Sequence, residues 1–216
     1  TAVGAQSLQV NTVGASNSGF GRYTLQNNTA DNNTAVGRSA LQENTTGTQN
    51  TAVGAYAGDA LTDADYNTAL GYAALTLDTL GSHSVAIGHD ALATQNFTSA
   101  TPSYNTAVGS QAGVAVTTGY NNTLVGGLSG DGITTGHSNT TLGVSSLGIN
   151  TTGIYNLALG ISALESNTTA SYNTAVGANA LDANTTASNN TAVGYASLGV
   201  NTTGTQNVAV GALALD

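Results

Sequence analysis

The 216-residue chain contains no cysteine, methionine, tryptophan or lysine, and only one proline. Without cysteine it forms no disulfides and carries out no thiol chemistry, although this absence leaves the cellular compartment open. Two arginines stand against eleven acidic residues, and the net charge of −9 argues against binding to nucleic acid or to an anionic membrane. Only 6% of the residues are charged and 40% are hydrophobic, unlike a disordered chain. No apolar run is long enough to span a membrane.

A short motif ending in glycine, most often Thr-Ala-Val-Gly, recurs along the whole chain. Ten of the twelve intervals between its glycines are 17 residues long, and the other two are 16 and 21. Such a period predicts one unit stacked on itself, and we expect a single repeat-built β-solenoid domain over residues 1–216. Because the chain begins and ends inside a repeat, we also expect an internal segment of a longer fibre. The structural turn glycines are Gly4, Gly21, Gly37, Gly54, Gly71, Gly88, Gly109, Gly126, Gly143, Gly160, Gly177, Gly194 and Gly211.

Within each repeat, the residue before the glycine is always large and apolar, which predicts that it faces the core. Two places earlier stands Thr or Ser, replaced in three repeats by Val85, Leu157 and Val208, so this position is also expected to face inward. The residue between them, mostly Ala, then lies on the opposite face of a short strand. Four residues after the glycine, a Leu marks a second short apolar segment, and a turn follows. The pattern predicts an all-β parallel β-solenoid of about 13 coils of 17 residues, each with two short strands and two corners.

Three repeats lack this Leu and have glycine in its place. Three residues later, where the other repeats have Asn, Asp or Gln, these three have a large aliphatic residue. A side chain lost from one position is replaced from a nearby one, so both positions are predicted to fill the same narrow interior. The exchanged pairs are Gly58 with Leu61, Gly113 with Val116 and Gly130 with Ile133.

Polar residues are equally regular. Asn precedes the strand in eleven of twelve repeats, and Thr holds the second turn position in eleven of twelve. Identical side chains stacked at the ~4.8 Å strand spacing can form hydrogen-bonded ladders along the axis. The interior of such a coil is thin, and the small Ala on the other face of each strand is expected to let another chain approach closely. Both features favour association of several chains.

The sequences NTAVG (Asn33 to Gly37, Asn50 to Gly54, Asn105 to Gly109, Asn173 to Gly177) and HSVAIG (His83 to Gly88) resemble the repeats of YadA-like head domains of trimeric autotransporter adhesins. The resemblance covers the whole chain. It implies a left-handed parallel β-roll, a side-by-side homotrimer, extracellular display on a cell or virion surface, and adhesion to surfaces or matrix proteins. Similar rolls in phage tail fibres and other bacterial surface filaments leave those assignments open.

A binding function is expected first where the period breaks. The 21-residue interval adds four residues near Phe97, Pro102 and Tyr104, which makes this segment a possible binding loop, with a tolerated corner bulge as the alternative. Four tyrosines share one corner position, where they form an exposed aromatic stripe for a glycan or surface, or simply cover the corner. These are Tyr66, Tyr104, Tyr155 and Tyr172.

Metal binding is a weaker expectation. Asp59, Asp63 and Asp65 have a spacing that a loop can wrap around Ca²⁺, but no glycine or Glu completes a known calcium loop, so solvated corner acids are favoured. The set of His83, His89 and Asp90 is a still weaker candidate for a metal site. N-x-T sequons are explained as turns; they begin at Asn44, Asn150, Asn167, Asn184 and Asn201, among others. No metal site, cofactor or catalytic group is predicted, and we do not expect an enzyme.

The leading hypothesis is a non-enzymatic structural and adhesive repeat segment of an extracellular fibre. Its expected partners are copies of itself, in a homotrimer or homopolymer, and a host or environmental surface. The alternatives are a self-assembling filament subunit, a phage tail-fibre shaft and an ice-binding solenoid. Ice binding requires the Thr rows to face solvent, whereas Val85, Leu157 and Val208 predict that one row faces inward.

Overall fold

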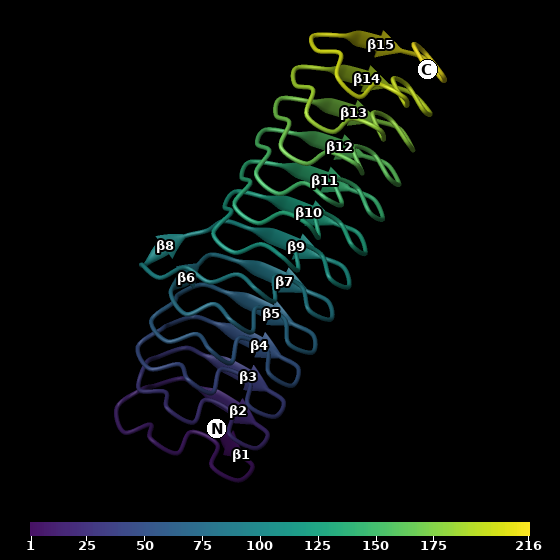
Figure 1. The fold of residues 1–216 in the computed structure, drawn as a ribbon. Coiled ribbons are helices and arrows are strands. Elements are labelled where there is room, and N and C mark those ends of the chain that lie inside the picture. Colours follow the sequence, from purple (N-terminus) through teal and green to yellow (C-terminus); the bar gives the residue numbers. More distant parts are fainter. The chain divides into compact units, whose positions relative to one another are not determined.

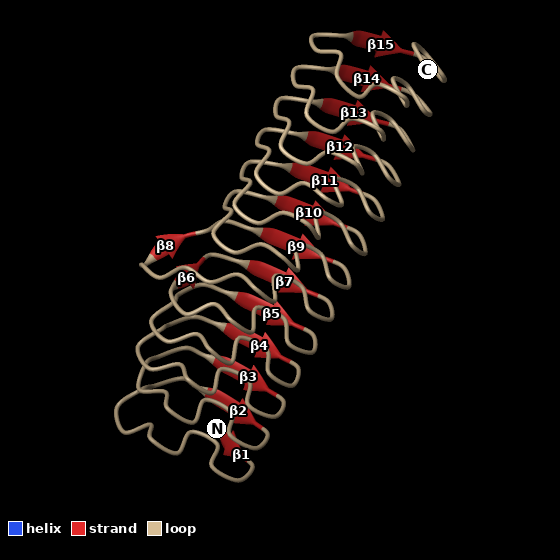
Figure 2. Ribbon diagram, in the orientation of Figure 1, coloured by secondary structure: helices blue, strands red, loops and turns tan.

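The computed structural model describes all 216 residues as an all-β parallel β-solenoid of about 12 turns, with about 17 residues per turn and no helix (Figures 1 and 2). This architecture confirms the predicted fold class. The chain divides into two compact units, Thr1–Asn105 and Thr106–Asp216. Each turn contains one short strand of the main sheet, and most of its remaining residues form tight turns.

The main sheet has thirteen parallel strands, which follow one another in chain order. In the first unit these are β1 (Ala2–Val3), β2 (Ser18–Phe20), β3 (Thr34–Val36), β4 (Thr51–Val53), β5 (Thr68–Leu70) and β7 (Val85–Ile87). In the second unit they are β9 (Thr106–Val108), β10 (Thr123–Val125), β11 (Thr140–Leu142), β12 (Leu157–Leu159), β13 (Thr174–Val176), β14 (Thr191–Val193) and β15 (Val208–Val210). Paired residues lie one repeat apart, as Ala175 and Ala192 do, so equivalent side chains form straight columns.

The two faces of the strands are reversed relative to the sequence prediction. The middle residue of each strand points into the solenoid, and Ala158 and Ala175 have no exposed surface. The flanking residues face outward, and Leu142 at the end of β11 is 53% exposed. The prediction that the large apolar residue and the Thr face the core is therefore wrong. The interior is so narrow that one large side chain per turn fills it, and only a small residue fits opposite.

The large interior residue is the Leu four places after the turn glycine, and it does not lie in a strand. Leu164, for example, is fully buried and has a φ of 55°. It begins a tight turn, because Asn167 N donates to Leu164 O at 3.1 Å. Leu164 N donates to Ala180 O of the next turn at 3.0 Å, so hydrogen bonds between turns continue without a second strand. The left-handed backbone is costly for Leu, and burial of the side chain, worth ~1.5–3 kcal/mol, offsets this cost.

The structure explains why three repeats have glycine at the Leu position and a large aliphatic residue three places later. Leu61, Val116 and Ile133 have no exposed surface. A Cβ atom added to Gly58 would lie 3.0 Å from Leu61 Cδ1. Both sequence positions therefore fill one interior, which confirms the prediction.

The thirteen turn glycines end the strands in a backbone conformation that other residues rarely adopt. Their φ angles lie between 125° and 145°. They also stack closely, since a Cβ atom on Gly126 would lie 2.4 Å from Gly143 O in the next turn. Backbone conformation disfavours a side chain at all thirteen positions, and close approach of the next turn also excludes one at Gly126 and most of its equivalents, though not at Gly211 in the last turn.

Buried asparagines connect successive turns. In the column before the strands, Asn156 N donates to Asn139 Oδ1 at 3.0 Å, and Asn156 Nδ2 donates to Ala170 O at 2.9 Å. A second column follows the buried Leu, where Asn167 Nδ2 donates to Asn150 Oδ1 at 2.9 Å. These amides satisfy the backbone of the corners, where no strand partner is present. The predicted Asn ladder is thus present, together with a second one.

Candidate interaction surfaces

The outward face of the main sheet is uncharged and largely apolar. It consists of the strand residue before each glycine and the Thr-rich position two places earlier, and neither position holds a charged residue in any repeat. Leu142 and Leu70 in these columns are 53% and 43% exposed. The apolar column of the first unit consists of Val3, Phe20, Val36, Val53, Leu70 and Ile87. That of the second consists of Val108, Val125, Leu142, Leu159, Val176, Val193 and Val210.

One substitution in the sequence indicated this orientation. Leu124 occupies the middle strand position, where Ala is usual, in the same repeat that has Gly130 instead of the interior Leu. Leu124 is fully buried. Its presence shows that the middle column shares the interior with the Leu column.

A second surface is a row of aromatic rings at the corner that precedes the strands. In the first unit, the ring centroid of His83 lies 4.8 Å from that of Tyr66 and 5.0 Å from that of Tyr104. In the first unit the predicted row of exposed tyrosines therefore includes a histidine, which lies between Tyr66 and Tyr104.

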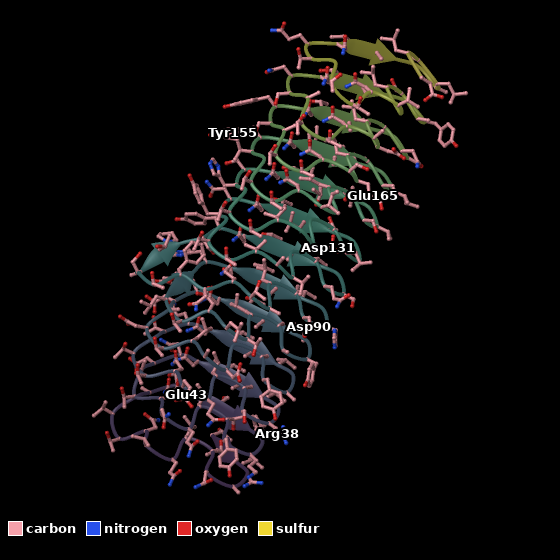
Figure 3. The ribbon with its side chains drawn as sticks, viewed as in Figure 1. Arg38, Glu43, Asp90, Asp131, Tyr155 and Glu165 are labelled. Atoms are coloured by element: carbon pink, nitrogen blue, oxygen red, sulfur yellow. The ribbon has the colours of Figure 1, made fainter.

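The same corner of the second unit holds four rings, which we call the corner ladder: Tyr120, His137, Tyr155 and Tyr172. Tyr120 stacks on His137 at 4.5 Å, and Tyr155 stacks on Tyr172 at 5.3 Å. His137 and Tyr155 meet edge to face at 5.7 Å. Figure 3 shows Tyr155 on the side of this unit away from Asp131 and Glu165. The sequence prediction omitted Tyr120 and His137, because they lie one residue earlier in their repeats.

The predicted binding loop is an anchored extension of a corner. β6 (Gly81–Ser82) and β8 (Thr101–Pro102) pair in parallel as a separate two-stranded sheet, visible beside β7 in Figure 1. Phe97 is buried, with only 6% of its surface exposed, whereas Tyr104 is 57% exposed and contacts His83. The loop encloses no pocket.

A buried polar network holds this extension in place. Asp78 Oδ1 accepts hydrogen bonds from Gly81 N at 3.0 Å and from Phe97 N at 3.1 Å. Gln95 Nε2 donates to Asp78 Oδ2 at 2.5 Å and to Ser84 Oγ at 2.8 Å. Asp78 and Gln95 stand where most other repeats have Asn, so the wider corner is matched by different polar side chains.

The three acids considered for calcium do not converge. Asp59 accepts from Thr76 Oγ1 at 2.5 Å, Asp63 from Thr46 Oγ1 at 2.6 Å and Asp65 from Thr48 N at 2.6 Å. Burial raises the pKa of Asp59 above its ordinary value, and the hydrogen bond from Thr76 opposes this shift. No group of three or more His, Asp or Glu side chains is placed to hold a metal ion.

His83 and His89 are held by different neighbours. His83 lies between Tyr66 and Tyr104, whereas His89 stacks on Tyr72 at 5.5 Å. His89 Nδ1 lies 3.2 Å from Asp90 Oδ2. The set of His83, His89 and Asp90 thus does not form one site.

On the edge away from the corner ladder, Asp131 and Glu165 flank Gly148 (Figure 3). A Cβ atom on Gly148 would lie 3.4 Å from Asp131 Oδ1 and 3.8 Å from Glu165 Cγ. Burial raises the pKa of Asp131, and the negative charge of Glu165 raises it further.

The sequon asparagines belong to the buried ladder. Asn44, Asn150, Asn167 and Asn184 have no exposed surface. Their amides bond to the turn and to neighbouring asparagines, as Asn184 Nδ2 does to Ala187 O at 2.9 Å and to Asn167 Oδ1 at 3.1 Å. A glycan on such a residue is incompatible with the folded corner.

Comparisons of the chain with family models, curated proteins and solved structures gave no match. No helix capable of crossing a membrane is present. Function is therefore inferred from the sheet face and the corner ladder.

Proposed function

We propose that this chain is a non-enzymatic structural and adhesive repeat segment of an extracellular fibre, in which identical solenoids associate side by side through the outward sheet face. The observation that carries the proposal is the outward apolar column of the main sheet. Soluble monomers rarely leave large continuous apolar patches in contact with water. In the second unit this column holds seven aliphatic residues in seven successive turns, from Val108 to Val210.

The energetics of the sheet face favour association between copies. Complete burial of one Val or Leu side chain contributes roughly 1.5–3 kcal/mol, and several of these residues are already partly covered by their neighbours. No charged group has to be desolvated, because the face has none. Regular columns also allow one copy to pack against the same columns of another. The resemblance to YadA-like head repeats favours a homotrimer displayed outside the cell.

Light scattering on the complete chain tests this association. One chain has a mass of 21.2 kDa, and we expect the folded protein to have a multiple of that mass. Leu142→Lys, in the sheet face, should shift the protein to the monomer. Ile149→Lys is a matched control, because Ile149 is 52% exposed, against 53% for Leu142, and follows the buried Leu147 on the wall opposite the strand. A folded wild-type chain that stays monomeric at high concentration contradicts the proposal.

The outward Thr column favours a second candidate function, ice binding. Thr174 and Thr191 are paired in register in β13 and β14, and both are partly exposed. The objection that this row faces inward therefore does not hold. A regular array of hydroxyl and methyl groups can order water in the way an ice surface does. Thermal hysteresis in the wild type, lost in Thr174→Lys and retained in Ile149→Lys, which lies outside the sheet face, would favour ice binding; its absence from the wild type would eliminate it.

A further inference from the structure

We propose that the corner ladder binds a neutral linear polysaccharide that lies along the stacking direction of the turns. This inference rests on the adhesive half of the proposed function and is independent of how copies of the chain associate. It concerns the four rings Tyr120, His137, Tyr155 and Tyr172 of the second unit.

The ladder presents aromatic surface to solvent at every turn. Tyr120, Tyr155 and Tyr172 are 40%, 52% and 54% exposed. Stacking within the pairs Tyr120–His137 and Tyr155–Tyr172 orients the rings, with interplanar angles of 13° and 15°. Between the pairs, the planes of His137 and Tyr155 differ by 83°, so one ring meets the other by its edge and the stack is interrupted there.

The surroundings of the ladder are polar but uncharged. The corner segments 119–123, 136–140, 153–157 and 170–174 contain no Asp, Glu, Lys or Arg. Most side chains next to the rings along the chain are small and polar, with Ile154 beside Tyr155 as the exception, and His137 Nδ1 lies 3.2 Å from Ser138 Oγ. A polyanion finds no cation here and is repelled by the net charge of −9, whereas a polycation finds no carboxylate. The ligand that fits is neutral.

The repeat of the ladder matches a linear sugar polymer. Successive turns are ~4.8 Å apart, and an extended β-1,4-linked pyranose chain advances by a similar distance per sugar. Sugars beside Tyr120, Tyr155 and Tyr172 can therefore receive a hydrogen bond from a phenol and pack their C–H groups against exposed aromatic surface, whereas the sugar beside His137 meets an imidazole. The surface has no pocket, which suits an extended chain more than a single sugar. A protein partner would require an apolar centre, whereas here Gly, Asn and Ser flank three of the four rings.

Tyr72 in the first unit is a suitable control. It is 53% exposed, like the ladder tyrosines, but it belongs to a different row that includes Tyr56 and His89. That row is capped by charge, since the Arg38 guanidinium lies 4.6 Å from the centroid of Tyr56. Removal of the Tyr72 ring therefore changes exposed aromatic area without changing the ladder.

Co-sedimentation of the complete chain with insoluble cellulose, chitin, mannan and β-1,3-glucan tests the proposal. We expect the wild type to bind at least one of them, and Tyr155→Ala/Tyr172→Ala to bind it about tenfold more weakly. Tyr72→Ala should bind like the wild type. Tyr155→Phe/Tyr172→Phe keeps both rings and should lose less affinity than the alanine variant. An unchanged melting temperature in each variant shows that the fold is kept.

Three outcomes overturn the proposal. They are failure of the wild type to bind any of the four polysaccharides, equal binding by the wild type and the alanine variant, and a change of oligomeric mass in the alanine variant, which would make the ladder a contact between copies. Leu142→Lys separates this result from the proposed assembly, because it leaves the ladder intact. Polysaccharide binding per chain should survive in that variant even when it is monomeric.

Discussion

The side chain of Leu124 occupies the space that a side chain at Gly130 would need. A Cβ atom on Gly130 would lie 2.8 Å from Leu124 Cδ2 and 2.8 Å from Ile133 Cδ1. Leu124 comes from the strand, whereas Gly130 and Ile133 come from the opposite wall. One interior is therefore filled from three sequence positions, and its volume is conserved although the residues differ between repeats.

Gly130→Leu should lower the free energy of unfolding by about 3 kcal/mol, because the new side chain overpacks the space held by Leu124 and Ile133. The backbone accepts Leu there, since Gly130 has a φ of 59° and Leu147, the equivalent residue one repeat later, has 55°. Urea unfolding measures the change. The triple variant Leu124→Ala/Gly130→Leu/Ile133→Asn recreates the common repeat and should recover most of the loss. Equal instability of both variants would contradict the shared interior.

Gly126→Ala should destabilise the protein by about 2 kcal/mol or more, because φ is 133° and the added Cβ atom would lie 2.4 Å from Gly143 O. The neighbouring Gly127→Ala is the matched control. A Cβ atom there meets only Ser110 O, at 3.9 Å. Thermal unfolding should show a large decrease in Tm for the first variant and little change for the second. Similar Tm values for the two would argue against close stacking of the turns.

Asn156→Ala should reduce the free energy of unfolding by about 2 to 4 kcal/mol, because a buried backbone donor loses its partner. Asn156 Oδ1 accepts from Asn173 N at 3.0 Å, and Asn156 is only 2% exposed. Asn27→Ala, which removes an exposed contact with Glu43, should cost less than about 1 kcal/mol. Chemical denaturation compares the two. A small effect at Asn156 would show that the Asn ladder contributes little.

Asp131→Asn should increase stability at neutral pH, because burial raises the folded-state pKa of Asp131 above its ordinary value of 3.8. The protonated carboxyl contributes this stability in full below pH 3.8. The contribution is lost as the pH rises through the raised pKa of Asp131 in the folded state. The gain should be less than about 1 kcal/mol at pH 7, since the group is partly exposed, and should vanish near pH 3. Unfolding curves across this range test it. Glu165→Gln should reduce part of the same pH dependence, and a gain in Asp131→Asn that is independent of pH would contradict the assignment.

The solenoid and its interior exchange could be predicted because both depend on regularities along the chain. The spacing of the turn glycines indicates a repeating coil, and Gly58 with Leu61 indicates conservation of volume. The orientation of the strands could not be predicted in the same way. Alternation of Thr, Ala and Val distinguishes two faces but does not identify the inner one, and hydrophobicity alone favours the large residues inside. A second strand in each turn was predicted from the short apolar segment around the Leu position. In the structure this Leu, Leu164 for example, lies in a tight turn and is still buried.

The candidate surfaces show the same division. Tyr155 and Tyr172 share one repeat position, so part of the aromatic stripe could be predicted. Tyr120 and His137 lie one residue earlier, and only the path of the corner brings them into line. Phe97 was expected in a binding loop, but the buried Asp78 carboxylate accepts its backbone N–H.

By itself, the sequence determined that this protein is a coil of about 17 residues repeated along its length, with neutral corners and an interior of constant volume. Apart from the single substitution at Leu124, only the tertiary structure decided which side of each strand is inside. The reason is the narrowness of the interior: Leu164 and its equivalents fill it from one wall, only a small residue such as Ala158 fits opposite, and the larger aliphatic residues are left on the outer face.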